Sequence, residues 1–122
     1  MTPKVTAWGL RNPFRLKFDH ENRLFATIHG IDERGSRPIA NSPDEFHIIS
    51  PGTWYGWPDY TGGLLDTLPM FKPDNKPQPE YLLRSHPMQP PKPLASFEPH
   101  SATLASSRLR ETLHYQPVLF GV

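Results

Sequence analysis

The chain has 122 residues, of which 36% are hydrophobic, and its thirteen basic and twelve acidic residues leave a net charge of +1. No block of like charge is present, so the sequence gives no indication of a nucleic-acid partner or of a charged membrane surface. No apolar run approaches the ~20 residues of a membrane-spanning helix, and the complete lack of cysteine excludes disulfides and cysteine-bound metals.

Proline is the most unusual feature of the composition. It accounts for 16 of the 122 residues, more than twice its usual share of ~5%. Because proline fixes φ and lacks a backbone donor, it opposes long helices and central strands alike. Three tryptophans, four tyrosines and seven phenylalanines argue against a wholly disordered chain. The composition therefore favours an all-β protein of short strands joined by long ordered loops.

Three strands are predicted near the start of the chain. Residues 14–18 alternate apolar and basic side chains, which is the period of a half-buried strand. Residues 19–22 form a turn rich in Asp and Asn, and residues 23–28 return as the second strand of a hairpin. Residues 46–49 are predicted as a third strand after a long polar loop.

The remainder of the chain carries weaker patterns. Residues 51–99 are predicted to be mostly loop, because their prolines leave no window for a helix of ten residues. Residues 102–113 contain fair helix formers, and both a short helix and a loop are open there. No internal repeat of fixed period is visible.

Five motifs in a fixed order carry a family resemblance, and they lie between Gly9 and Pro58. They are Gly9-Leu10-Arg11-Asn12-Pro13, Asn22-Arg23-Leu24-Phe25-Ala26-Thr27, Gly30, Asp44-Glu45 and Gly52-Thr53-Trp54-Tyr55-Gly56-Trp57-Pro58. In this order they resemble the soluble quinoprotein glucose/sorbosone dehydrogenases. Two further stretches, residues 32–38 and 93–101, resemble a sorbosone or pyranose dehydrogenase-like subgroup of that family.

The resemblance implies a fold and an activity. The implied fold is a six-bladed β-propeller, of which this chain would form a fragment of about one blade plus long loops. Residues 1–102 would be the propeller segment and residues 103–122 a divergent tail. The implied cofactors are pyrroloquinoline quinone and calcium, and the implied reaction is oxidation of an aldose, sorbosone or pyranose by hydride transfer to the quinone.

The resemblance also implies partners and a limit on activity. A sugar or aldehyde substrate and an electron acceptor are the expected partners of complete relatives, and a membrane span is not expected. Relatives are mostly periplasmic or secreted, but the first residues lack a secretion signal, so localisation stays open. The histidine that serves as general base in relatives belongs to a segment before residue 1, so the chain by itself is expected to be inactive.

Arg11 and Asn12 are predicted to bind the cofactor. The quinone carries three carboxylates, which suit a planar guanidinium that binds two oxygens at once. Asn12 adds a neutral donor and acceptor, and Pro13 favours an extended backbone at Asn12. The alternative is that both side chains satisfy carbonyls of a buried loop.

Three further residues are assigned by the resemblance. Gly30 and Ile31 align with the place where relatives offer backbone carbonyls to calcium, which accepts such oxygens from any residue type. Ile31 stands where proline is frequent, and an ordinary glycine turn is the alternative. Asp44 aligns with an acidic residue near the cofactor, although a solvated loop end would have the same sequence.

Aromatic and histidine side chains receive structural interpretations. The aromatic cluster of residues 54–57 is more typical of a packed loop than of a sugar platform, because Trp and Tyr bury large areas. The six histidines lack the spacing of zinc ligands. Two alternatives to a dehydrogenase piece stay open: a propeller segment that has lost its chemistry, and a truncated gene product.

Overall fold

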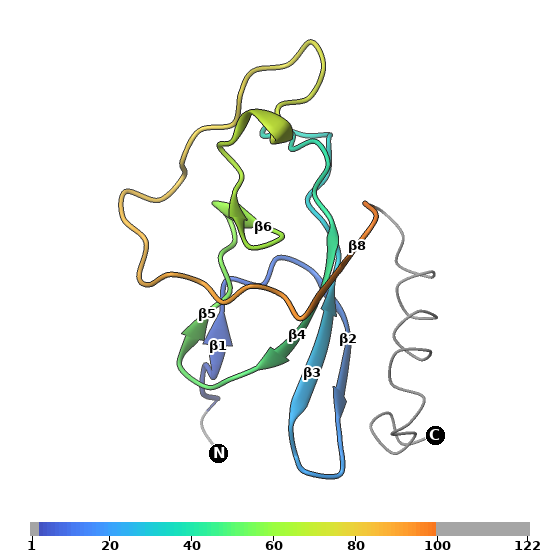
Figure 1. Cartoon of the computed structure of the whole chain (residues 1–122). Helices are drawn as coiled ribbons and strands as arrows, with labels where there is room; N and C mark the ends of the chain where they lie inside the picture. The colour runs from blue at the N-terminus through green and yellow to red at the C-terminus, as the bar shows by residue number, and fades with distance from the viewer. Residues whose placement is uncertain (1–2, 100–122) are drawn as a thin grey trace.

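A computed structural model describes residues 3–99, and this part of the chain is all-β (Figure 1). Its elements, in chain order, are β1 (Ala7–Trp8), β2 (Pro13–Phe18), β3 (Leu24–Ile28), β4 (Asp44–Ile49), β5 (Thr53–Trp54), β6 (Tyr60–Thr61), β7 (Leu64–Leu65), the 3-10 turn η1 (Pro69–Phe71) and β8 (Ala95–Phe97). The all-β prediction is therefore confirmed.

The main sheet has four strands in the order β2-β3-β4-β8, and every neighbouring pair is antiparallel. The four strands lie in the sheet in their chain order, although residues 50–94, which include β5, β6 and β7, separate β4 from β8 (Figure 1). A four-stranded antiparallel meander is the architecture of one blade of a β-propeller.

The β2–β3 hairpin forms because its turn residues bond the local backbone. One Asp19 carboxylate oxygen accepts the Glu21 and Arg23 amides at 2.9 and 2.8 Å, and the other accepts Arg23 Nε at 2.6 Å. Asn22 adopts a φ of 62°, a left-handed conformation that Asn tolerates better than most residues. The predicted hairpin is confirmed.

The core of the sheet lies on one face, where Phe25 and Phe46 stack with ring centroids 5.4 Å apart. Both rings are buried, and Ile48, Ala95 and Phe97 pack against them. Antiparallel register explains the cluster, because Phe25 pairs with Ile48 and Phe46 pairs with Ala95 across neighbouring strands. Residues in register lie on the same face of a sheet.

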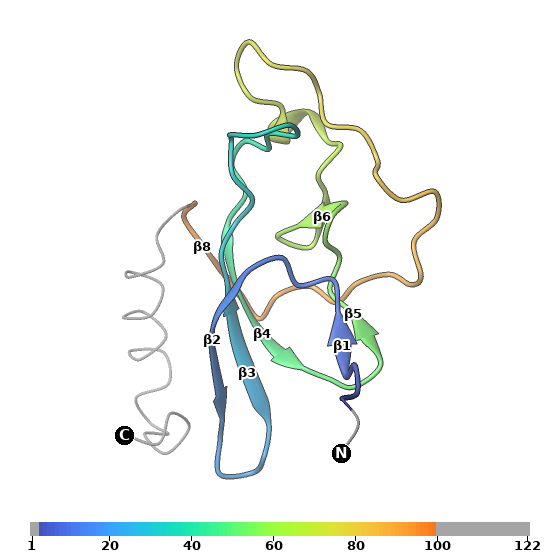
Figure 2. The same cartoon turned by 180° about the vertical axis from the view of Figure 1, so that it is seen from behind.

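A smaller unit stands beside the sheet. β1 pairs with β5 in parallel, and β6 pairs with β7 in antiparallel (Figure 2). Trp54 and Tyr55 are 1% and 6% exposed, whereas Trp57 is 44% exposed. The prediction of a packed aromatic loop is thus confirmed for Trp54 and Tyr55, and Trp57 departs from it.

The predicted strands 14–18, 23–28 and 46–49 correspond to β2, β3 and β4, whose observed bounds differ by one or two residues. β8 was not predicted, and the sheet owes its fourth strand to it. The proposed boundary at residues 102/103 and the segment 102–113 lie outside the described residues. Within residues 3–99 no helix is long and apolar enough to cross a membrane.

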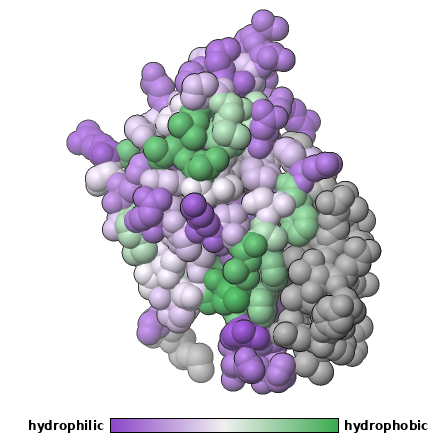
Figure 3. Space-filling model, viewed as in Figure 1, coloured by the Kyte–Doolittle hydropathy of each residue, from purple (hydrophilic) through white to green (hydrophobic). Residues whose placement is uncertain are grey.

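Apolar side chains also reach the surface. On the face shown in Figure 3 they gather in separate patches with polar surface between them. Leu16 and Phe18 on β2 are among the exposed apolar residues.

Candidate functional site

The predicted site residues belong to loops at one end of the main sheet. Because β3 runs antiparallel to β2 and β4, its last residue lies beside the first residues of both: Ile28 pairs with Pro13 and with Glu45. The loop before β2 and the long loop between β3 and β4 therefore meet at the end of the sheet opposite the β2–β3 turn (Figure 2).

A small hollow lies where these loops meet the β5–β6 segment. Its volume is about 20 Å³, which is enough for one water molecule or one ion. The residues that line it include Arg11, Gly30, Ile31, Ser42, Glu45, Trp57, Tyr60 and Thr61. Three predicted site residues, Arg11, Gly30 and Ile31, are thus brought together.

Arg11 lines this hollow, and its side chain is partly exposed. Its Nη1 donates to the Gly30 carbonyl at 3.3 Å, and its Nη2 forms an ion pair with Asp32 at 3.4 Å. The Arg11 side chain is 27% exposed and the Asp32 side chain 42%. The guanidinium therefore sits at a solvent-accessible position beside a backbone carbonyl.

Gly30 and Ile31 are held from behind by the segment that enters β4. The Gly30 amide donates to Asp44 Oδ1 at 2.8 Å, and the Ile31 amide donates to Ser42 Oγ at 2.7 Å. Position 30 requires glycine, because a Cβ there would lie 2.2 Å from the Ser42 carbonyl oxygen. The two amides face the protein, and the Gly30 carbonyl faces Arg11.

The side chains of Asp44 and Glu45, two neighbouring residues of β4, point to opposite faces of the sheet. Successive strand residues point to opposite faces, and Glu45 lines the hollow whereas Asp44 does not. Asp44 is 1% exposed, and its Oδ2 has no hydrogen-bond partner among residues 3–99. Glu45 accepts the Gly62 amide at 2.9 Å and contacts His47 at 2.7 Å. The structure thus places Asp44 behind Gly30, with Glu45 at the hollow.

Asn12 is exposed and does not line the hollow. Its carbonyl accepts the His29 amide at 3.1 Å, and a bulge between Pro13 and Arg15 accompanies the stacking of Phe14 on His29 at 4.0 Å. These contacts fix the backbone on which Arg11 stands, while the Asn12 side chain stays at the surface.

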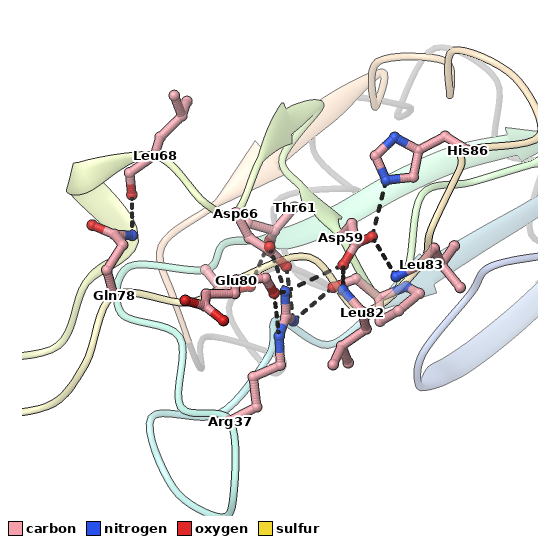
Figure 4. A network of polar contacts seen from close by, with 12 residues as sticks. Arg37, Asp59, Thr61, Asp66, Leu68, Gln78, Glu80, Leu82, Leu83 and His86 are labelled. Atoms are coloured by element: carbon pink, nitrogen blue, oxygen red, sulfur yellow. Dashed lines mark hydrogen bonds and ion pairs between the residues drawn. The ribbon is translucent and has the colours of Figure 1, made fainter.

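A buried charge cluster joins Arg37 of the β3–β4 loop to Asp59, which precedes β6, and to Asp66, which follows β7 (Figure 4). Arg37 binds both oxygens of Asp66, at 2.8 and 3.2 Å, and one oxygen of Asp59 at 3.3 Å. The Asp59 carboxylate also accepts the Leu82 amide at 2.8 Å and contacts His86 at 2.9 Å. Asp59 and Asp66 are both fully buried, so the cluster ties three distant segments together.

The two carboxyl groups of the cluster have pKa values that move in opposite directions. Burial raises the pKa of Asp59. Hydrogen bonds from the Leu82 amide, His86 and the Leu83 amide, together with the charge of Arg37, bring this pKa below its ordinary value. Burial raises the pKa of Asp66 further than its hydrogen bonds and ion pair with Arg37 lower it. Asp59 is consequently the member of the pair that the fold stabilises as an anion.

Sequence reasoning missed several residues of the site and its support. Ser42, Thr61 and Arg37 were not predicted, and they come from loops whose pairing no periodicity reveals. Glu45 could have been found, because the predicted strand alternates and places only one of two adjacent carboxylates on each face.

The all-β architecture, with one four-stranded antiparallel sheet among residues 3–99, is consistent with a fragment of a β-propeller. The family follows from the sequence match: the model of the glucose/sorbosone dehydrogenase family covers residues 1–82, more than half of the 122-residue chain. The chain belongs to this family. Comparison with curated proteins and with solved structures gives no match.

The residues present fit the cofactors that the family implies. Arg11 supplies a partly exposed cation, paired with Asp32 in this structure, for carboxylates, and Gly30 supplies a carbonyl oxygen of the hard type that calcium accepts. Among residues 3–99, no group of three or more acidic or histidine side chains could hold a metal, so a cation here would depend on backbone oxygens and on the cofactor.

Proposed function

We propose that this chain contributes one sector of a sugar dehydrogenase site that uses pyrroloquinoline quinone and calcium. The observation that carries the proposal is the Arg11–Gly30 contact of 3.3 Å at the hollow, together with the family match over all predicted site residues. When bound, the quinone takes hydride from the sugar and calcium polarises the quinone.

In this proposal each residue has a limited role. Arg11 binds a cofactor carboxylate or quinone oxygen, and Gly30 and Ile31 offer carbonyl oxygens to calcium. Asn12 contributes a neutral donor and acceptor to the cofactor from the surface next to Arg11, and Asp44 acts through the Gly30 amide that it binds. A cation beside the Arg11 guanidinium is repelled unless an anion lies between them. Calcium binding is therefore expected to require the anionic cofactor.

The sorbosone or pyranose dehydrogenase-like subgroup is part of the same proposal, as is the fragment character of the chain. Residues 3–99 contain one four-stranded sheet, whereas a propeller is built from about four to eight such sheets. The site of a propeller is assembled from loops of several blades. The expected substrates are therefore aldoses or related sugars, oxidised only when the other sectors are supplied.

Replacement of Arg11 by alanine in a complete homologous enzyme should weaken cofactor binding by about 1.5–3 kcal/mol, the contribution of a hydrogen bond to a charged group. Isothermal titration of the apoenzyme with the quinone at saturating calcium measures the effect. Arg15→Ala is the matched control, because Arg15 is exposed on β2 and does not line the hollow. Equal dissociation constants for wild type and Arg11→Ala would limit Arg11 to a structural role in the loop.

The purified chain, supplied with quinone and calcium, is expected to show no dye-linked oxidation of glucose or other aldoses. The general base is expected outside this segment, and its loss removes about 10²–10⁴ of the rate. Oriented groups supply about 7–11 kcal/mol of a barrier in favourable cases, and one sector cannot orient the sugar. Turnover above a protein-free blank that Arg11→Ala abolishes would show that this chain assembles a working site.

A further inference from the structure

Hydrogen bonds from the Gly30 and Ile31 amides to the side chains of Asp44 and Ser42 fix the orientation of the backbone at these two residues. A trans peptide unit is planar, and its N–H and C=O point in opposite directions. The unit that joins these residues carries the Ile31 N–H and the Gly30 carbonyl, and it is not cis. Because the N–H donates to Ser42 Oγ at 2.7 Å, the Gly30 carbonyl points away from Ser42. That carbonyl lies 3.3 Å from Arg11 Nη1.

Ser42 is itself fixed by a second hydroxyl. Its Oγ lies 2.6 Å from Thr61 Oγ1, and the two residues are 1% and 2% exposed. A hydroxyl has one donor and two acceptor sites, so Ser42 accepts the Ile31 amide while it shares a hydrogen with Thr61. The Ile31 amide, the Ser42 hydroxyl and the Thr61 hydroxyl form a short chain of hydrogen bonds that joins two walls of the hollow.

The type of residue at position 31 determines whether a hydrogen-bond acceptor such as Ser42 is needed for the backbone amide there. Proline, which is frequent there in the family that the sequence resembles, has no N–H and has a fixed φ. Isoleucine brings an amide that needs an acceptor and a φ that needs another constraint. Ser42 supplies both in this chain, because it binds the amide and is held in place by Thr61.

We propose that Ser42 is a positioning residue of the site, which directs the Gly30 carbonyl into the hollow as a ligand for an oxygen-coordinated cation such as calcium. Ser42 acts through the Ile31 amide and does not touch the cation. The inference rests on the proposed function, because it assigns a role in the same cation site.

A double-mutant cycle in the full 122-residue chain tests the proposal. The variants are Ser42→Ala, Ile31→Pro and their combination, with Ser36→Ala as the control, since Ser36 is an exposed serine of the same loop. Urea unfolding gives the stability, and amide NMR titration with calcium chloride in the presence of pyrroloquinoline quinone gives the apparent cation affinity. NMR detects weak binding, so a single sector of a site suffices.

Ser42→Ala is expected to raise the unfolding equilibrium constant about tenfold, the cost of a buried amide without an acceptor. The apparent calcium affinity should fall by a similar factor. In the Ile31→Pro background, the same substitution should leave the calcium affinity unchanged, because no amide is left to satisfy, and should cost less stability, since only the Ser42–Thr61 hydrogen bond is lost. Ser36→Ala should change nothing. The rescue by proline is a result that a general loss of packing at Ser42 would not produce.

The outcomes separate the inference from the proposed function. If the wild-type Gly30 and Arg11 signals do not respond to calcium with the quinone, the proposed function fails, and the cation role of Ser42 with it. If wild type responds and Ser42→Ala keeps the same affinity, the positioning role is overturned. If a variant of the cycle does not fold, Thr61→Val takes its place. It should weaken calcium binding less than Ser42→Ala, and an unchanged affinity there contradicts the hydroxyl chain.

Discussion

Replacement of Asp59 by alanine is expected to lower the free energy of unfolding by about 3–5 kcal/mol, the usual cost of removing one partner from a buried charge pair. The Asp59 carboxylate is fully buried and accepts hydrogen bonds from the Leu82 and Leu83 amides, from Arg37 and from His86. Alanine leaves these donors without their acceptor (Figure 4).

The pH dependence of stability gives a second measure of the same group. The pKa of Asp59 lies below its ordinary value, so its ionised form stabilises the fold above about pH 4, and this stabilisation is lost as the pH falls through the lowered value. Asp66, whose pKa is raised, acts in the opposite sense: its ionisation opposes folding as the pH rises through its raised value. Asp59→Ala should therefore unfold with a shallower acid dependence than wild type.

Urea titrations at neutral pH and at several acidic values measure both effects. Asp74→Ala is the control, because Asp74 is exposed and lies in the loop that the cluster fastens. The control should match wild type within about 0.5 kcal/mol. A similarly small loss for Asp59→Ala would mean that the segment around residues 80–86 is held mainly by packing.

The local features of the fold were predictable from the sequence. The β2–β3 hairpin follows from period-2 alternation and from the turn chemistry of Asp19 and Asn22, which act on residues close in the chain. β8 was not predictable in the same way, because Ala95–Phe97 is three residues long and pairs with β4 across the intervening residues 50–94. Such a strand exists because the sheet edge accepts it, and its own sequence carries little preference.

In the candidate site, too, the residues of local sequence motifs were predictable, whereas contacts between residues distant in the chain were not. Arg11, Gly30 and Ile31 were identified by motif, and the antiparallel register of three strands brings their loops together. The supporting contacts of Ser42 with Thr61 and of Arg37 with Asp59 join residues about twenty positions apart in irregular loops. No periodicity links such residues, because loop conformations are set by turns, caps and tertiary contacts.

Gly30→Ala is expected to destabilise the chain by about 3 kcal/mol, near the upper end of the usual cost of overpacking. The new Cβ would lie 2.2 Å from the Ser42 carbonyl oxygen and 2.9 Å from the Pro43 carbonyl oxygen. Both contacts are with backbone, which cannot rotate away as a flexible side chain does. The loop before β4 must therefore move, and the hydrogen bonds of Gly30 to Asp44 and of Ile31 to Ser42 are expected to lengthen or break.

A matched glycine separates the collision from the intrinsic cost of alanine. Gly35 lies in the same loop with a φ of +91°, and a Cβ there would meet nothing within 4 Å. Gly35→Ala should cost about 1 kcal/mol, from backbone strain only. Urea unfolding compares the two variants, and amide exchange at Ile31 reports the local effect. Protection of the Ile31 amide should fall in Gly30→Ala and stay unchanged in Gly35→Ala. Equal destabilisation with intact protection would show that the backbone around Ser42 adapts to a Cβ, and the close approach would then not be what requires glycine at position 30.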